Sequence, residues 1–428
     1  MSSRSRQVIH TVLTRFARVA LGAATGIVIA RSLHAEGRGA YAAVVAVASM
    51  AQSVGHMSVE QAHTALWRRA RASIPSNSLL LGPAVGTFAG TAALIIVLLL
   101  GPRAVPLPSY GLLLVALAAV PLGMTVLYVN SVLVLQGRLN VVNRASLVAA
   151  VGQCGALLGF AFTGTLTVGV VVWVWTIAAG LPLVMLVPAM RPRLRDVDRR
   201  LAGATLTYGL RYHLAFAALY LLLRLDVLLL NGLSTPTAVG LYSLAVTIAE
   251  LAWIVTDAAA QVALARQADT ELADAAAVTL AATRTSALLS AVAVAGMCLT
   301  APVLVPLLYG PGFAGSVPAL MGLAVGIFAL GATRPVNGFL VRLNRPVVSS
   351  AISLSAVAAN VVLCLVLIPR WGVVGCGLAS SGGYAILGGA QVAWFLRATG
   401  TPARRLLPGR ADLDRLTRPG RRRARVDA

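Results

Sequence analysis

The sequence predicts an all-α polytopic membrane protein, with about 12 transmembrane helices in two six-helix lobes. Hydrophobic residues make up 58% of the 428 residues and charged ones only 11%, whereas a soluble domain is about 45–50% apolar and about 25% charged. The apolar runs are also long enough, because about 20 helical residues cross the ~30 Å hydrocarbon core of a bilayer. A transmembrane β-barrel would show alternating segments of about ten residues, and this sequence has no such pattern.

Glycine or proline marks most of the joints between successive apolar runs. Both residues interrupt helices, proline because it lacks a backbone N–H and glycine because of its conformational freedom. The joints contain Gly101-Pro102, Gly137, Pro236, Pro311-Gly312, Pro346 and Pro369. The spans are therefore expected at residues 11–33, 39–59, 78–101, 109–135, 145–165, 167–189, 204–231, 239–258, 282–309, 314–340, 347–368 and 373–396.

The arginine distribution predicts the orientation of the chain. The formal net charge is +22, and all 35 basic residues are arginine. With both termini inside, 26 arginines fall on cytoplasmic segments if Arg284, two residues inside the ninth span, is counted with them, three on outer loops and the other six within spans. This asymmetry follows the positive-inside rule and argues against nucleic acid as a partner. We expect a multi-pass protein of the inner (cytoplasmic) membrane with both termini in the cytoplasm.

Segments outside the spans are short and carry no signature of an enzyme. The segment 59–73 is predicted to be an interfacial amphipathic helix, and residues 397–428 a basic, disordered cytoplasmic tail that can contact anionic lipid. The four cysteines lie in apolar runs without a CxxC pair, so neither a metal site nor a cofactor is expected. Loops without a cluster of His, Glu and Asp argue against an integral-membrane enzyme.

An internal repeat predicts the two lobes. Gly39-x-Tyr41 and Gly240-x-Tyr242 are 201 residues apart, and each opens an even-numbered span after a charged odd-numbered one. Six spans per repeat give an N-terminal lobe over residues 1–195 and a C-terminal lobe over residues 196–396. Transporters built from such repeats bind substrate between the halves, near the membrane midplane.

Charged and polar residues recur inside the predicted spans of the N-terminal lobe. An ionisable group at the centre of a span costs roughly 2.5–3.5 kcal/mol on insertion scales, so each one suggests a functional site. Arg15 and Arg18 share a face of the first span, either as a cationic wall or as residues that snorkel to the inner interface. Gln52, His56 and Glu60 follow at i, i+4 and i+8, as one polar stripe.

The C-terminal lobe has its own intramembrane charges. Arg224 and Asp226 lie on opposite sides of the seventh span, so they cannot pair locally. Ser243, Thr247, Glu250 and Asp257 form a stripe in the eighth span that faces a wet cavity or makes interhelical hydrogen bonds. Arg334 and Asn337 lie one turn apart in the tenth, where Arg334 has a cavity role or anchors the inner leaflet.

This pattern favours a cavity that binds an anion. The planar guanidinium fork suits phosphate or diphosphate, so we assign the anionic headgroup to the cationic and polar residues of the spans, Arg15, Arg18, Arg224, Arg334, Asn337, Gln52 and His56. The carboxylates Asp226, Glu250, Asp257 and Glu60 are candidates for a coupling ion. The sequence leaves H⁺, Na⁺ and no ion open.

Four stretches resemble the polysaccharide/oligosaccharide flippase family. They are residues 30–41, the Arg224-Leu225-Asp226 and Gly240-Leu241-Tyr242 pair, residues 308–318, and the block from Asn360 to Tyr384 that contains LIPRWGVVG. This family holds O-antigen-type exporters, in the MOP superfamily with MATE efflux pumps and lipid II flippases. The sequence departs from it at His34-Ala35-Glu36 and in its lack of lysine, and it lacks the two extra helices of lipid II flippases.

The resemblance implies a transporter rather than an enzyme. The expected activity is flipping of a lipid-diphosphate-linked oligosaccharide to the outer leaflet, by alternating access, for cell-surface polysaccharide biosynthesis. It implies a cavity lined by spans 1, 2, 7 and 8. Its partners would be the lipid-linked glycan, membrane lipids, and glycan polymerase or glycosyltransferase proteins. The alternative is a MATE-like cation or drug antiporter, which would favour a carboxylate-rich cavity.

Overall fold

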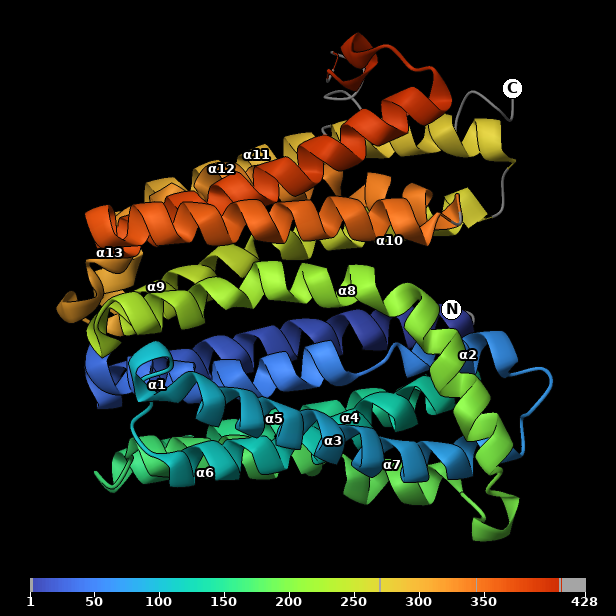
Figure 1. The fold of residues 1–428 in the computed structure, drawn as a ribbon, viewed down its shortest axis with the longest axis horizontal. Coiled ribbons are helices and arrows are strands. Elements are labelled where there is room, and N and C mark those ends of the chain that lie inside the picture. The colour runs from blue at the N-terminus through green and yellow to red at the C-terminus, as the bar shows by residue number, and fades with distance from the viewer. Residues whose placement is uncertain (1–2, 269–270, 344, 408, 410–428) are drawn as a thin grey trace. The chain divides into compact units, whose positions relative to one another are not determined.

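A computed structural model describes residues 3–268, 271–343, 345–407 and 409, and confirms the predicted fold class (Figure 1). Within these residues every regular element is a helix, α or 3₁₀. The predicted basic tail lies mostly outside the described residues. Its described part holds only the end of the last long helix and the 3₁₀ helix Ala403–Leu406.

Ten helices of the described chain are long and apolar enough to cross a membrane, where the sequence predicts about twelve. The difference comes from two long elements, α1 (Ser3–Gly55) and α13 (Pro346–Thr399), of 53 and 54 residues. Each is two helices joined at a single non-helical residue with positive φ, His34 in α1 and Gly372 in α13. A straight helix of this length would measure about 80 Å, so each element supplies two of the predicted spans.

The other elements follow the predicted spans with two interruptions. They are α2 (Val59–Leu66), α3 (Ser73–Ala104), α4 (Tyr110–Leu135), α5 (Leu139–Phe162), α6 (Val168–Gly180), α7 (Leu183–Met190), α8 (Arg199–Leu233), α9 (Pro236–Leu251), α10 (Trp253–Ala268), α11 (Leu272–Tyr309) and α12 (Ser316–Arg342). However, α10 ends and α11 begins ten residues from the predicted span ends at 258 and 282. The sixth span is divided into α6 and α7, and the eighth into α9 and α10. The amphipathic segment is helical only over α2, half of its predicted length.

The chain forms two compact units that differ from the predicted lobes. Unit 1 holds residues 1–243 and 306–313, and unit 2 holds residues 244–305 and 314–428. The boundary therefore falls inside α9, and α8 belongs to unit 1. The lobes follow from a sequence repeat and the units from spatial contact, so the lobe boundary at 195/196 stays a prediction.

In unit 1, α3 and α4 pack side by side through glycines (Figure 1). A Cβ on Gly82 would lie 2.6 Å from the Thr125 Cα, and one on Gly86 would lie 2.3 Å from the Pro121 Cα. Small residues four apart let membrane helices approach closely, and van der Waals contact then replaces the hydrophobic driving force that lipid cannot supply. This helix pair contributes much of one buried cluster of unit 1, with Leu81, Val85, Leu113 and Val120.

In unit 2, the tight turn of α13 depends on the glycines of the block LIPRWGVVG. Gly372 has φ 54°, a conformation that costs little without a Cβ. Three residues later, a Cβ on Gly375 would lie only 2.1 Å from the Leu367 carbonyl oxygen. The two halves of α13 therefore begin their contact directly at the turn, which explains why the predicted joint between spans 11 and 12 is so short.

We predict that Gly86→Ala destabilises the protein while Gly90→Ala does not. Both changes favour the helix, since Ala is a better helix former than Gly by about 1 kcal/mol. Only at Gly86 does the new methyl meet backbone, because a Cβ at Gly90 has its nearest neighbour at 3.6 Å. Overpacking typically costs about 1–3 kcal/mol. Thermal unfolding in detergent should show a lower Tm for G86A alone; equal Tm values would contradict the packing argument.

Candidate functional site

The two repeat-related glycines meet each other within unit 1. A Cβ on Gly39 would lie 1.7 Å from the Pro236 carbonyl oxygen, and one on Gly240 would lie 1.8 Å from the Ala35 carbonyl oxygen. Real Cβ atoms essentially never approach within 3.0 Å of such neighbours. The start of the second span and the start of the eighth therefore cross backbone to backbone, at the side that the arginine distribution predicts to be outer.

Asp226 of the Arg-Leu-Asp motif and Tyr242 of the Gly-x-Tyr motif contact each other. Asp226 is fully buried, and its Oδ2 accepts a hydrogen bond from the Tyr242 hydroxyl. Its Oδ1 accepts from the Val227 backbone N–H at 2.8 Å. Gly240 permits the close crossing, and Tyr242, two residues later, reaches back to α8. Asp226 thus has a structural role at this crossing, and its predicted part in ion coupling stays a prediction; Arg224 is half-buried on the same helix.

A second contact at the same side involves an arginine whose role the sequence left open. Arg31, three residues before the break in α1, donates from Nε to the Leu308 carbonyl at 2.8 Å and from Nη2 to the Leu307 carbonyl at 2.7 Å. These carbonyls belong to the last turn of α11, where backbone acceptors lack helical partners and the helix dipole favours a cation. Arg31 thus caps the C-terminus of α11.

The predicted stripe of Gln52, His56 and Glu60 on one helix is wrong. The helix ends at Gly55, and α2 begins only at Val59; between them Met57 and Ser58 have φ of 50° and 48°. Gly55 is needed at this break, because a Cβ there would lie 2.3 Å from the Ala89 Cβ. The break still brings His56 and Glu60 together, with 3.4 Å between His56 Nδ1 and Glu60 Oε1.

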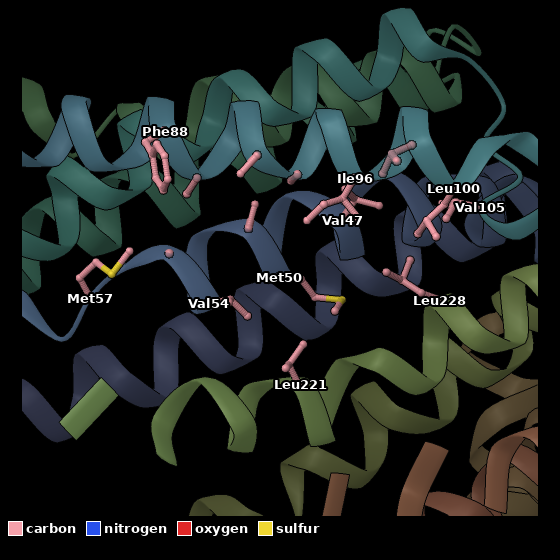
Figure 2. Close-up of a pocket in the computed structure, with 16 residues that line it drawn as sticks. Val47, Met50, Val54, Met57, Phe88, Ile96, Leu100, Val105, Leu221 and Leu228 are labelled. Atoms are coloured by element: carbon pink, nitrogen blue, oxygen red, sulfur yellow. The ribbon is translucent and has the colours of Figure 1, made fainter. Parts of the chain in front are cut away.

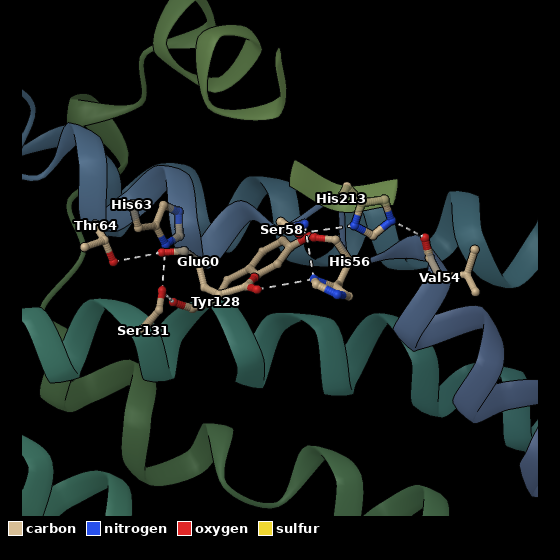
Figure 3. A network of polar contacts seen from close by, with 9 residues as sticks. All are labelled: Val54, His56, Ser58, Glu60, His63, Thr64, Tyr128, Ser131 and His213. Atoms are coloured by element: carbon tan, nitrogen blue, oxygen red, sulfur yellow. Dashed lines mark hydrogen bonds and ion pairs between the residues drawn. The ribbon is translucent and has the colours of Figure 1, made fainter. Parts of the chain in front are cut away.

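A network of hydrogen bonds holds this break in place (Figure 3). His213 of α8 donates from Nε2 to the Val54 carbonyl at 2.6 Å, which leaves its Nδ1 to accept from the Ser58 hydroxyl at 3.2 Å. The Tyr128 hydroxyl donates to the His56 carbonyl at 2.8 Å. Gly209 of α8 also presses on the break, since its Cβ would lie 2.1 Å from the Met57 carbonyl oxygen.

Two groups, the Ser58 backbone N–H and the Glu60 carboxylate, lie against the same nitrogen of His56. His56 Nδ1 accepts from the Ser58 backbone N–H at 3.1 Å, which requires a lone pair on that nitrogen. The same nitrogen lies against Glu60 Oε1, and that contact is favourable only when a proton lies between the two atoms. Glu60 Oε2 is buried and makes no hydrogen bond to any described residue. His56 Nδ1 therefore cannot bond to the Ser58 N–H and to Glu60 Oε1 at the same time.

The remaining predicted residues of unit 1 lie apart from this network. Gln52 packs against α4, since a Cβ on Gly123 would lie 2.7 Å from both polar atoms of its amide. Arg15 and Arg18 are exposed on the first half of α1, near the exposed side chains of Leu13 and Phe16. Exposure among apolar side chains fits the snorkelling interpretation as well as the cationic wall, and the role of the two arginines stays a prediction.

In unit 2 the structure pairs two residues predicted for different roles. Arg334 forms a salt bridge with Asp257, and its guanidinium lies 4.9 Å from the ring centroid of Trp253. The Trp253 indole N–H donates to the Ile327 carbonyl at 3.1 Å, which fixes the ring. The Asp257 carboxylate therefore offsets the positive charge of Arg334, which we expected to bind an anionic headgroup.

Two further predicted residues of unit 2 lie outside this pair. Asn337 is exposed and accepts a hydrogen bond from Gln391 Nε2 at 3.3 Å. Glu250 is half-buried near the end of α9, and Asp257 lies beyond the break at Ala252, so the predicted stripe of the eighth span is interrupted as well. Among the described residues, no group of three or more His, Cys, Asp or Glu side chains is placed to hold a metal ion.

An apolar groove adjoins the histidine network in unit 1 (Figure 2). It has a volume of about 330 Å³, within the range of about 300–1,000 Å³ typical of ligand sites. Its walls come from α1, α3 and α8, with Val47, Met50, Phe88, Ile96, Leu100 and Leu228 among them. Val54, Gly55 and Met57 also line it, and they flank His56 in the chain. The groove thus ends at the break that carries the polar network.

Sequence reasoning missed Ser58 and Tyr128, two residues that complete the network. A helical period places neither on the stripe, because Ser58 lies in the non-helical break and Tyr128 comes from α4. The only local signal was Gly55, whose conformational freedom permits an interruption of the span.

Comparison with known proteins identifies the fold. No protein-family model and no curated protein matches the sequence. Among solved structures, a multidrug resistance MATE family transporter of the MOP superfamily, inward-facing, matches with a TM-score of 0.70 and 14% identity over 90% of this chain and 94% of its own. The lipid II flippase MurJ, inward closed, matches with a TM-score of 0.69 and 12% identity over 96% and 91%.

The MATE transporter VcmN of Vibrio cholerae, in its bent form, matches with a TM-score of 0.53 and 16% identity, over 92% of this chain and 94% of its own. At these identities the comparisons show the shared fold alone. The expected MATE/MOP-like architecture is therefore confirmed.

We predict that Gly240→Ala opens the crossing between the starts of the second and eighth spans. The new methyl cannot lie 1.8 Å from a backbone oxygen, so the two segments must separate by more than 1 Å. In a cysteine-free background, a cysteine at the buried Ala238 should react several-fold faster with a membrane-impermeant maleimide. Gly22→Ala is the matched control, because a Cβ there has no neighbour within 4 Å. Equal labelling of both variants would contradict the tight crossing.

Proposed function

We propose that the protein is a transporter that moves a lipid-diphosphate-linked oligosaccharide from the inner to the outer leaflet of the cytoplasmic membrane. The observation that carries the proposal is the apolar groove of unit 1 that ends at the histidine network. A ligand that fits both is an amphiphile, with a hydrocarbon chain in the groove and a polar headgroup beside the network. The exported glycan would serve cell-surface polysaccharide assembly.

The length and lining of the groove support a lipid chain as its occupant. Residues 88–100 of α3 line one wall, and twelve helical steps measure about 18 Å, slightly more than half of the ~30 Å hydrocarbon core. All of its lining residues are apolar. An apolar chain gains from such a lining, whereas a hydrated cation does not.

The crossing at Gly39 and Gly240 supports alternating access as the mechanism. At this crossing the starts of two repeat-related spans touch backbone to backbone, without side chains between them. Such a contact can separate and form again without rearrangement of side chains. Separation of this crossing would open a path to the outer leaflet. In repeat-built transporters, alternating access is largely a rigid-body motion of one repeat against the other.

A MATE-like antiporter of cations or drugs remains the second candidate, because a MATE transporter matches the fold as well as MurJ does. The two candidates differ in what they require of the groove. A long-chain amphiphile can bind only if the groove is free to take its hydrocarbon chain. A small cation does not require a free groove. Partner polymerase and glycosyltransferase proteins, and both termini in the cytoplasm, belong to the first candidate as predictions.

We predict that Arg224→Ala lowers surface glycan while the amount of protein in the membrane is retained. Loss of one charge-assisted hydrogen bond costs about 1.5–3 kcal/mol, or roughly 10- to 100-fold in headgroup binding. Arg200→Ala, in the exposed first turn of the same helix, is the control and should export normally. Normal surface glycan in R224A at equal protein level would remove Arg224 from the site.

We predict that Ala92→Trp blocks flipping and Thr91→Trp does not. Ala92 lines the groove and Thr91, one residue earlier on α3, does not. The indole would occupy much of the groove volume and displace a lipid chain. In proteoliposomes with a fluorescent lipid-diphosphate saccharide, T91W should flip the headgroup and so protect it from a chemical reagent on the other side of the membrane. A92W should give no such protection. Equal rates in both variants, together with drug efflux that is unaffected by A92W, would favour the antiporter.

A further inference from the structure

A second pocket of unit 1 is basic and lies away from the histidine network. Its volume is about 440 Å³, and its lining residues are Trp67, Arg71, Gln136, Arg138, Met190 and Arg191. These residues belong to the ends of α2, α4 and α7 and to the turns that follow them. The arginine distribution predicts that all three helix ends face the cytoplasm. The pocket therefore lies at the inner membrane interface.

Separate contacts hold the guanidinium groups of Arg71 and Arg138, and the backbone conformation of Arg191 sets the course of the chain beside them. Arg71 lies over the Trp67 ring, with 5.6 Å between its guanidinium carbon and the ring centroid. Arg138 donates from Nη1 to the Ala189 carbonyl, in the last turn of α7. Arg191 follows that turn in a left-handed conformation, with φ 55°, which directs the chain away from the helix axis.

Hydrogen bonds fix the segment after Arg191 against the start of α3. The Ser76 hydroxyl donates to the Arg193 carbonyl at 2.7 Å and accepts from the Arg193 backbone N–H at 3.1 Å. The Asn77 side chain makes two bonds to the backbone of Asp198, at 2.9 and 3.0 Å. The α2–α3 turn with Arg71 and the α7–α8 connection with Arg191 are thus tied together, which forms the pocket between them.

The positive charge of this pocket has no counterpart in the described chain. No salt bridge joins Arg71, Arg138 or Arg191 to a carboxylate among the described residues, and no acidic residue lines the pocket. Partial charges at the helix C-termini offset only part of three full charges. Arg138 gives one hydrogen bond to protein, to the Ala189 carbonyl, out of the five N–H donors of a guanidinium. Three cations around one opening create a site for an anion.

We propose that this pocket binds the phosphate headgroup of an anionic lipid of the inner leaflet. Guanidinium forks match phosphate oxygens in pairs. Tryptophan and arginine at a helix end are the residues that contact lipid headgroups at an interface. Basic pockets between helices on the cytoplasmic side bind anionic headgroups. The bound lipid would bridge the ends of α2, α4 and α7, whatever substrate the protein transports.

The test uses the purified full-length protein in nanodiscs of phosphatidylcholine with a small fraction of brominated lipid. Bromine quenches the fluorescence of nearby tryptophans. The difference in quenching between the unmodified protein and Trp67→Phe is the contribution of Trp67, and it reports on this pocket. Brominated phosphatidylglycerol should quench Trp67 more strongly than brominated phosphatidylcholine. Each arginine lost should weaken this preference by about fivefold, so R138Q with R191Q should abolish it.

The matched control is R69Q with R195Q, which removes the same charge from the neighbouring segments without touching the pocket lining. It should retain the preference for phosphatidylglycerol. Equal quenching by both lipids, or equal loss in the control and the test variant, would overturn the proposal. Inorganic phosphate added to the nanodiscs distinguishes the source of the anion: full displacement of the brominated lipid by millimolar phosphate would identify a free-anion site and contradict a lipid site.

Discussion

The structure depends on one constraint: a charged group among membrane helices must find a partner. Each unit satisfies it with short-range pairs. Asp226 accepts from Tyr242, Arg31 binds the last carbonyls of α11, and Arg334 pairs with Asp257. An unpaired charge at the centre of a span would cost roughly 2.5–3.5 kcal/mol, so these pairs fix which helix faces can meet. The contact of Tyr242 with Asp226 lies two residues from Gly240, at which the backbone of α9 touches that of α1.

The same constraint separates structural charges from those available to a ligand. The pairs above are satisfied within the protein and need no substrate. At the break after Gly55, by contrast, one nitrogen of His56 faces both the Ser58 N–H and the Glu60 carboxylate, and it cannot satisfy both in one protonation state. At the cytoplasmic ends of α2, α4 and α7, three guanidinium groups share a pocket without a carboxylate. Each of these places leaves an electrostatic demand open among the described residues, and both lie in unit 1.

The sequence predicted the fold well because hydrophobic length and glycine or proline joints are local signals. Pro369 marked the joint between spans 11 and 12, and the turn of α13 lies three residues later, at Gly372. It predicted the site less well, since contacts across helices have no local signal. The stripe from Gln52 to Glu60 assumed a helix through Met57 and Ser58, but His213, Tyr128 and Gly209 from other helices stabilise a break there. Likewise, nothing near Arg334 in the sequence indicated that Asp257 would be its partner.

The shared fold does not choose between a drug antiporter and a lipid flippase, because structures of both kinds match this chain almost equally. The choice rests on what the helices present to a ligand. A small cation needs carboxylates that are free to exchange partners. Asp257 is paired with Arg334 and Asp226 is buried against Tyr242, whereas Glu60 has one oxygen without a hydrogen bond to any described residue. A lipid-linked anion needs an apolar path beside a polar site. The groove along α1, α3 and α8 is lined by apolar residues, and it ends where Val54 and Met57 flank His56.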